Sequence, residues 1–182
     1  MQCPDCRTAL LETEYLGIRI DECPNCRGRW FDRDELRKAK DRTDDDLRWL
    51  DFDPFGPEAG PAPADATGRL CPRCQVTMRT VPYEKSDVVI DRCDQCHGVW
   101  LSHQQFERIV DYLDRIVSGT TASEYAKEAR KELAEIFTGP EGPLSEIRDY
   151  LAVLHLLRLR VAVEHPKIAH AVDRIYRMSP FK

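Results

Sequence analysis

The chain has no long, uninterrupted apolar segment. Its most apolar run is LAVLHLLRLRVAV, which is broken by His155, Arg158 and Arg160 and is too short to cross a bilayer. The first ten residues, MQCPDCRTAL, also lack the basic stretch followed by an apolar one that is typical of a secretory signal. These absences predict a cytoplasmic protein with no membrane partner.

The chain also lacks an excess of positive charge. It has 27 Lys and Arg against 32 Asp and Glu, which gives a formal net charge of −5. Proteins that bind nucleic acids usually present a basic surface, because most of their binding free energy comes from phosphate contacts. The overall charge therefore disfavours nucleic acid as the main partner.

The cysteines fall into four C-x-x-C pairs. Sixteen residues separate the inner cysteines of the first two pairs, and eighteen separate those of the last two. Without an export signal the thiols are expected to stay reduced, and this spacing is typical of zinc sites with four thiolates. The predicted ligands are Cys3, Cys6, Cys23 and Cys26 for one ion, and Cys71, Cys74, Cys93 and Cys96 for a second. Because four thiolates close a tetrahedral shell, both ions are predicted to be structural.

The two cysteine sets belong to an internal repeat. In the first copy Gly17 provides a turn, after which Ile18 and Ile20 alternate with polar residues as in a half-buried strand. The second copy has a longer polar turn at residues 84–87. Each copy is therefore predicted to be a zinc ribbon, in which a β-hairpin lies between two cysteine knuckles.

Acidic residues follow the first ribbon but not the second. Asp32 and Glu35 correspond to Ser102 and Gln105 in the repeat, and both pairs fit a capping box at the start of a helix. A general acid and base would need carboxylates, which the second copy lacks. No nucleophile, base or open metal site stands out elsewhere, so the protein is predicted not to be an enzyme.

A tryptophan follows the last cysteine of each set by four positions. Trp30 and Trp100 are interpreted as packing residues, each lying over its own zinc knuckle or on the first turn of the following helix. The alternative interpretation is a platform on which bases stack.

These motifs resemble the TFIIB-type zinc-ribbon (transcription factor zinc-finger) domain family. Residues 3–36 follow its pattern of CPxC, Leu, and then hydrophobic-Asp-x-CPxC-x-G-x-W-hydrophobic-Asp-x-x-Glu-Leu. Residues 71–106 resemble it with departures at Asp94 and in the segment LSHQQF, which spare the cysteines. The resemblance implies zinc binding, whereas its transcriptional name is an analogy of fold and establishes no role.

The remaining sequence predicts a linker and a helical tail. Residues 52–68 are rich in Pro and Gly. The overlapping segment LRWLDFDPF, residues 47–55, is interpreted as packing on its own domain, with a docking peptide for another protein as the alternative. Apolar spacing predicts helices from residue 106 to Gly119, from Thr121 to Phe137, from Leu144 to the break before Pro166, and from there to about Met178. The third is apolar around most of its circumference and is expected to be buried, in a bundle within one chain or completed by a second chain.

The sequence thus predicts a small, zinc-stabilised α+β protein with two zinc ribbons, each followed by a helix, and a C-terminal helical bundle. The expected segments are residues 1–50 (first ribbon and trailing helix), 51–68 (linker), 69–106 (second ribbon) and 107–182 (helical tail). The predicted function is that of a non-catalytic zinc-binding adaptor that binds a protein partner or self-associates through the tail.

The alternative function is a transcription-associated nucleic-acid-binding protein. It would use a local basic cluster in the first ribbon and its tail. The competing interpretation of this cluster is a solvated helix face with i,i+4 ion pairs. The cluster consists of Arg27, Arg29, Arg33, Arg37, Lys38 and Lys40.

Overall fold

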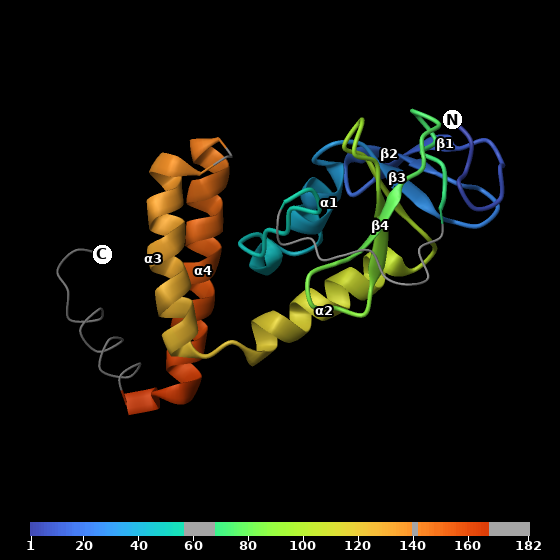
Figure 1. Cartoon of the computed structure of the whole chain (residues 1–182). Helices are drawn as coiled ribbons and strands as arrows, with labels where there is room; N and C mark the ends of the chain where they lie inside the picture. The colour runs from blue at the N-terminus through green and yellow to red at the C-terminus, as the bar shows by residue number, and fades with distance from the viewer. Residues whose placement is uncertain (57–67, 140–141, 168–182) are drawn as a thin grey trace. The chain divides into compact units, whose positions relative to one another are not determined.

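The computed structural model describes residues 1–56, 68–139 and 142–167, and it divides the chain into two compact units (Figure 1). The ribbon unit comprises residues 1–44 and 50–115, and the helical unit comprises residues 45–49 and 116–182. Both ribbons share one unit, and a short segment between them belongs to the other. Most of the predicted linker, residues 57–67, lies outside the described residues.

The ribbon unit is built on one antiparallel sheet of six strands in the order β1-β2-β3-β6-β5-β4. The first ribbon contributes β1 (Leu11–Tyr15), β2 (Ile18–Glu22) and β3 (Arg29–Phe31), and the second contributes β4 (Arg79–Pro82), β5 (Val89–Arg92) and β6 (Val99–Leu101). The predicted hairpins are β1-β2 and β4-β5. The predicted α+β class with two ribbons is therefore confirmed.

The turn of the first hairpin follows from its sequence. Leu16 and Gly17 both have positive φ, at 51° and 71°, as a tight two-residue turn of type I′ requires. After it, Ile18 and Ile20 are buried while Arg19 between them is exposed. The alternation expected from the sequence thus places one face of β2 in the core.

The third strand of each ribbon, which the sequence interpretation did not include, joins the two hairpins. Strands β3 and β6 pair antiparallel with each other, and Trp30 lies directly opposite Trp100. Each of these strands also pairs with its own hairpin, β3 with β2 and β6 with β5. The two ribbons are consequently related by an approximate two-fold axis at the tryptophan pair.

A helix follows each ribbon, as predicted. They are α1 (Glu35–Thr43) and α2 (Gln105–Gly119). Phe106 of α2 stacks on Phe31 of the first ribbon, with ring centroids 5.9 Å apart, and meets Tyr15 edge-on at 5.4 Å. The second ribbon's helix therefore packs against the first ribbon and adds a further connection between the two repeats.

The helical unit is centred on two antiparallel helices, α3 (Ala122–Thr138) and α4 (Pro143–Glu164), which lie side by side (Figure 1). A capping box starts α3: the Glu124 N–H donates to Thr121 Oγ1, and the Thr121 N–H donates to Glu124 Oε2. The fourth predicted helix lies almost entirely outside the described residues, which end at residue 167.

Residues 45–49 pack onto this helical pair. The 3-10 helix η1 (Asp45–Leu47) precedes Arg48, whose guanidinium pairs with the buried Asp149 of α4 at 2.9 Å. The ring of Trp49 meets that of Tyr125 edge-on at 5.7 Å. This segment, although it follows the first ribbon in sequence, supplies part of the core of the helical unit.

The segment LRWLDFDPF packs on its own chain, as the favoured interpretation held. Trp49 is buried in the helical unit, whereas Phe52 contacts Tyr83 of the second ribbon at 4.7 Å between centroids. Phe55 stacks on His97 at 4.7 Å. The aromatic residues that suggested a docking peptide are thus engaged within the chain.

Within the described part of a single chain, α4 is not covered on all sides. Ala152, Val153 and Leu156 face the core, but Leu144 and Leu151 remain 77% and 56% exposed. Helix α3 and the short segment 45–49 pack against one side of α4, whereas a helix that is apolar all round needs neighbours on every side. Among the described helices, none combines the length and the apolar character that a membrane span requires.

Candidate metal centres

Each cysteine pair forms a knuckle with the same backbone geometry. The residue after the second cysteine has a φ close to 60° at Arg7, Arg27, Gln75 and His97. Its N–H donates to the carbonyl of the first cysteine at 2.9 to 3.0 Å in all four knuckles. This left-handed residue folds the chain back so that both thiols of a pair point to one place.

The structure brings the eight predicted ligands together in two groups of four. Within each group the sulfur atoms all lie within 4.8 Å of one another. Closer distances are 3.4 Å for Cys3 Sγ to Cys26 Sγ and for Cys6 Sγ to Cys23 Sγ, and 3.7 Å for Cys71 Sγ to Cys96 Sγ. Four thiolates at about 2.3 Å from a tetrahedral zinc ion are separated by roughly 3.8 Å. Both groups therefore fit one zinc ion each, and the chain binds two.

The environment of the thiols links metal binding to proton release. Burial raises the pKa of Cys3, of Cys96 and of Cys71, the last to about 11, while the Thr8 side chain lowers the pKa of Cys6 to about 6. Thiols with raised pKa values are protonated near neutral pH when no metal is bound. Zinc must displace these protons, so binding it also fixes the fold of the knuckles.

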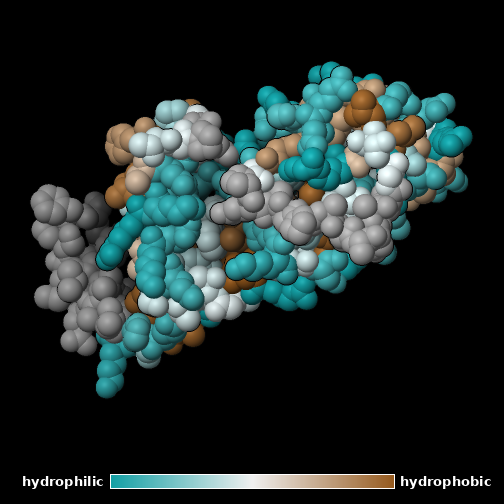
Figure 2. All heavy atoms as spheres, in the orientation of Figure 1, coloured by the Kyte–Doolittle hydropathy of each residue, from teal (hydrophilic) through white to brown (hydrophobic). Residues whose placement is uncertain are grey.

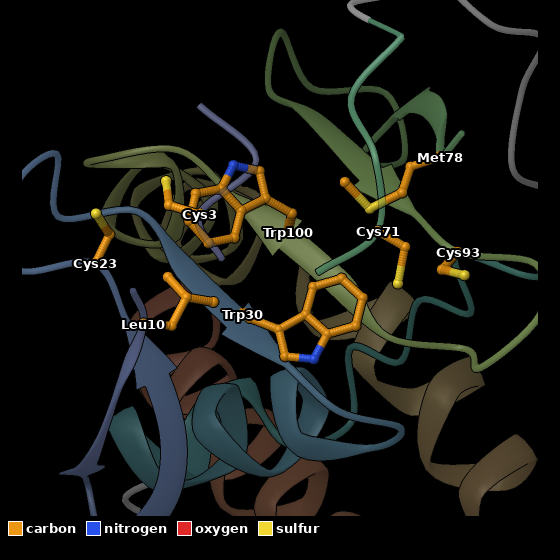
Figure 3. Packing of buried hydrophobic residues seen from close by; sticks show 8 residues of the cluster. All are labelled: Cys3, Leu10, Cys23, Trp30, Cys71, Met78, Cys93 and Trp100. Carbon is orange, nitrogen blue, oxygen red and sulfur yellow. The ribbon is translucent and has the colours of Figure 1, made fainter. Parts of the chain in front are cut away.

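The tryptophans cross between the ribbons (Figure 3). Trp30 and Trp100 have no exposed surface. A Cβ placed on Gly28 would lie 2.2 Å from the Trp100 ring, and one on Gly98 would lie 2.1 Å from the Trp30 ring. The interpretation that each indole covers its own knuckle was therefore wrong, because each packs on the knuckle of the other ribbon. The burial of both indoles also contradicts the alternative that they form a platform on which bases stack.

Polar contacts hold the two indoles in place. Trp30 Nε1 donates to Asp32 Oδ1 at 3.0 Å, and the guanidinium of Arg73 in the second ribbon donates to the same oxygen at 3.0 Å. Trp100 Nε1 donates instead to Asp5 Oδ2 of the first ribbon at 3.2 Å. The carboxylate that accepts the indole proton therefore comes from the first ribbon on both sides of the approximate two-fold axis.

This arrangement corrects the capping role assigned to Asp32. Glu35 does bond back to the Asp32 N–H at 2.8 Å, and Gln105 bonds to the Ser102 N–H at 2.6 Å. Helix α1 begins at Glu35, however, and the residue at its N-cap position is Asp34, without a side-chain cap. In each box only the hydrogen bond from the backbone N–H to the Glu35 or Gln105 side chain is present. The Asp32 carboxylate instead accepts a hydrogen bond from the Trp30 indole.

Asp32→Ala is expected to lower the free energy of unfolding of the zinc-loaded protein by about 1–2 kcal/mol. The reason is that the fully buried Trp30 N–H loses its acceptor, and an unsatisfied buried donor costs about that much. Asp32→Asn keeps an acceptor oxygen and should cost clearly less. Urea denaturation at a fixed zinc concentration measures both, and equal losses from the two variants would contradict this role.

The basic cluster is largely engaged in contacts within the chain. Arg27 and Arg29 both pair with Glu22, at 3.0 and 3.2 Å. Lys40 is buried and donates to the carbonyl of Leu50 at 2.9 Å. A continuous phosphate-binding surface would need these same cations, but they already pair with groups of the chain itself.

A third group of candidate ligands lies in the helical unit and was missed in the sequence. Carboxylate oxygens of Glu132, Glu135 and Glu146 lie within 4.8 Å of one another. Burial, together with the charge of Glu135, raises the pKa of Glu132 to about 8, which lets it keep its proton near neutral pH. Glutamates are ordinary residues in helices, so only the pairing of α3 with α4 reveals the group.

Comparison with family models identifies both ribbons. The transcription factor zinc-finger family, of the TFIIB zinc-ribbon type, matches residues 2–42 and again residues 70–112. Each match covers all four cysteines of one metal centre and the start of the following helix. No curated protein and no solved structure matches the chain.

Proposed function

We propose that this chain, which carries two TFIIB-type zinc ribbons, is a non-catalytic adaptor that binds protein through its helical unit. The ribbons bind two zinc ions in closed shells of four thiolates, an arrangement suited to structure because no coordination position is left for a substrate. In this proposal they form a rigid support, and the partner binds elsewhere.

The observation that carries the proposal is the uncovered apolar face of α4. Leu144, Ile147 and Leu151 are 77%, 39% and 56% exposed, and the half-buried Leu154 continues the row. Their spacing of three, four and three residues places them along one side of the helix, in the pattern by which helices pack against one another. Figure 2 shows apolar atoms gathered at the end of the helical unit where α3 leads into α4.

Such a face suits a helical protein partner better than nucleic acid. Its side chains offer no positive charge for phosphates, and the cations of the first ribbon are occupied as described above. A second copy of the chain is the simplest partner, because most soluble homo-oligomers are two-fold dimers in which the same patch is used twice.

The test is the mass of the full zinc-loaded chain by light scattering over a wide concentration range. A dimer that dissociates on dilution is expected, and Leu151→Glu should shift it to monomer by placing a charge in the interface. Leu11→Glu is the matched control, since Leu11 is equally exposed, at 57%, but lies on β1 of the ribbon unit. A monomer at every concentration, or equal effects of both variants, would contradict this use of α4.

A further inference from the structure

The two cysteine groups belong to one hydrophobic cluster. It contains Cys3, Leu10, Cys23 and Trp30 of the first ribbon with Cys71, Met78, Cys93 and Trp100 of the second, and the remaining four cysteines pack against it (Figure 3). Every member is less than a tenth exposed. A ribbon of about 35 residues has too little apolar surface for a core of its own, so this shared cluster is the core on which both depend.

The contacts within the cluster are crosswise. The knuckle of Cys23 and Cys26 ends at Gly28, which touches the ring of Trp100, and the knuckle of Cys93 and Cys96 ends in the same way at Gly98, which touches Trp30. The second knuckle of each ribbon is thus covered by an indole that the other ribbon supplies.

Polar and backbone contacts cross in the same way. The first ribbon's Asp5 accepts from Trp100 Nε1 at 3.2 Å and also pairs with the Arg69 guanidinium of the second ribbon. Arg69 in turn pairs with the buried Asp91 at 2.7 Å. Together with the pairing of β3 and β6, these contacts leave neither ribbon complete without the other.

We infer that the two zinc sites are coupled, so that each set of thiolates binds zinc tightly only while the other ribbon is loaded and folded. Loss of zinc from the first set releases the knuckle that ends at Gly28, and with it the surface on which Trp100 packs. Trp100 lies on β6, which directly follows the knuckle of Cys93 and Cys96 in the chain, so this second knuckle loosens as well. By linkage, the loss of the second ion weakens the first by the same factor.

The coupling is measured by titrating the full zinc-loaded chain with a chelator and counting ions by native mass spectrometry. Independent sites give a one-zinc species that reaches at least about half of the protein during the titration, whereas a coupling of about 100-fold limits it to about a tenth. We expect the two-zinc and zero-zinc species to dominate throughout. A one-zinc species at half of the protein or more would overturn the inference.

Gly28→Ala tests the crosswise contact itself. The new Cβ would meet the Trp100 ring at 2.2 Å, although alanine removes no zinc ligand and no backbone hydrogen bond. Gly119→Ala is the matched control, because nothing lies within 4 Å of its Cβ. The one-zinc species should rise several-fold in Gly28→Ala only, and loss of both ions from this variant alone would also support coupling. An unchanged titration would show that this contact does not couple the sites.

Discussion

Removal of zinc should unfold the ribbon unit while leaving most of α3 and α4 helical. The knuckles hold the ends of both hairpins, and their thiolates would repel one another or take up protons without the metal. The core of the ribbon unit is built around the same cysteines, so without zinc the unit loses the cluster that stabilises its fold. The helical unit contains no cysteine among residues 45–49 and 116–182 and keeps its own core.

Hydrogen exchange of the chain with and without a strong chelator measures this outcome. Amides of β2, β3, β5 and β6 should lose their protection, whereas the central amides of α3 and α4 should keep theirs. Native mass spectrometry of the untreated protein should show two zinc ions. Loss of protection in α3 and α4 in parallel with the sheet would show that the two units do not fold independently.

Trp30→Ala should lower the free energy of unfolding of the ribbon unit by about 3–5 kcal/mol, the usual cost of deleting a fully buried large aromatic side chain. Trp30 has no exposed surface, and its ring fills the space above Gly98 in the other ribbon. The variant should therefore unfold at a lower urea concentration, and its Cys93 and Cys96 should be chemically labelled faster than those of the unchanged protein. Trp30→Phe should have a free energy of unfolding between those of the unchanged protein and Trp30→Ala, since it keeps an aromatic ring but loses the N–H that binds Asp32.

The control for this variant is Leu11→Ala in β1. Leu11 is 57% exposed and should change the free energy of unfolding by no more than about 0.5 kcal/mol. Urea denaturation at one fixed zinc concentration makes the variants comparable, because bound zinc itself adds to the apparent stability. A cost for Trp30→Ala close to that of Leu11→Ala would contradict the shared core.

The metal centres could be predicted from the sequence because their ligands are local and repeated. The C-x-x-C spacing fixes two thiols on one knuckle, and a second knuckle about twenty residues later completes the shell whatever the rest of the chain does. The turn at Gly17, the box at Thr121 and Glu124, and the ends of α3 were predictable for the same reason. Each depends on residues within one turn of backbone.

The partners of Trp30, Trp100 and Asp32 could not be predicted in this way. Sequence spacing placed each tryptophan beside its own cysteines, but a short strand with an exposed edge pairs with whatever edge is available. That edge belongs to the other ribbon, so the indoles cross and Asp32 accepts from Trp30. The composition of α4 predicted that the helix is covered on all sides, but only the structure shows which face its neighbours in the same chain leave open.

The sequence by itself determined two zinc sites with four cysteines each, their hairpins and the helices that follow, since all of these arise from short-range spacing and periodicity. Only the tertiary structure decided that the two ribbons form one sheet and one core, with each indole on the other's knuckle, and that one face of α4 is left uncovered. The physical reason is that edge pairing and burial are fixed by which surfaces meet in space, and two similar repeats meet through surfaces that neither one shows in its own sequence.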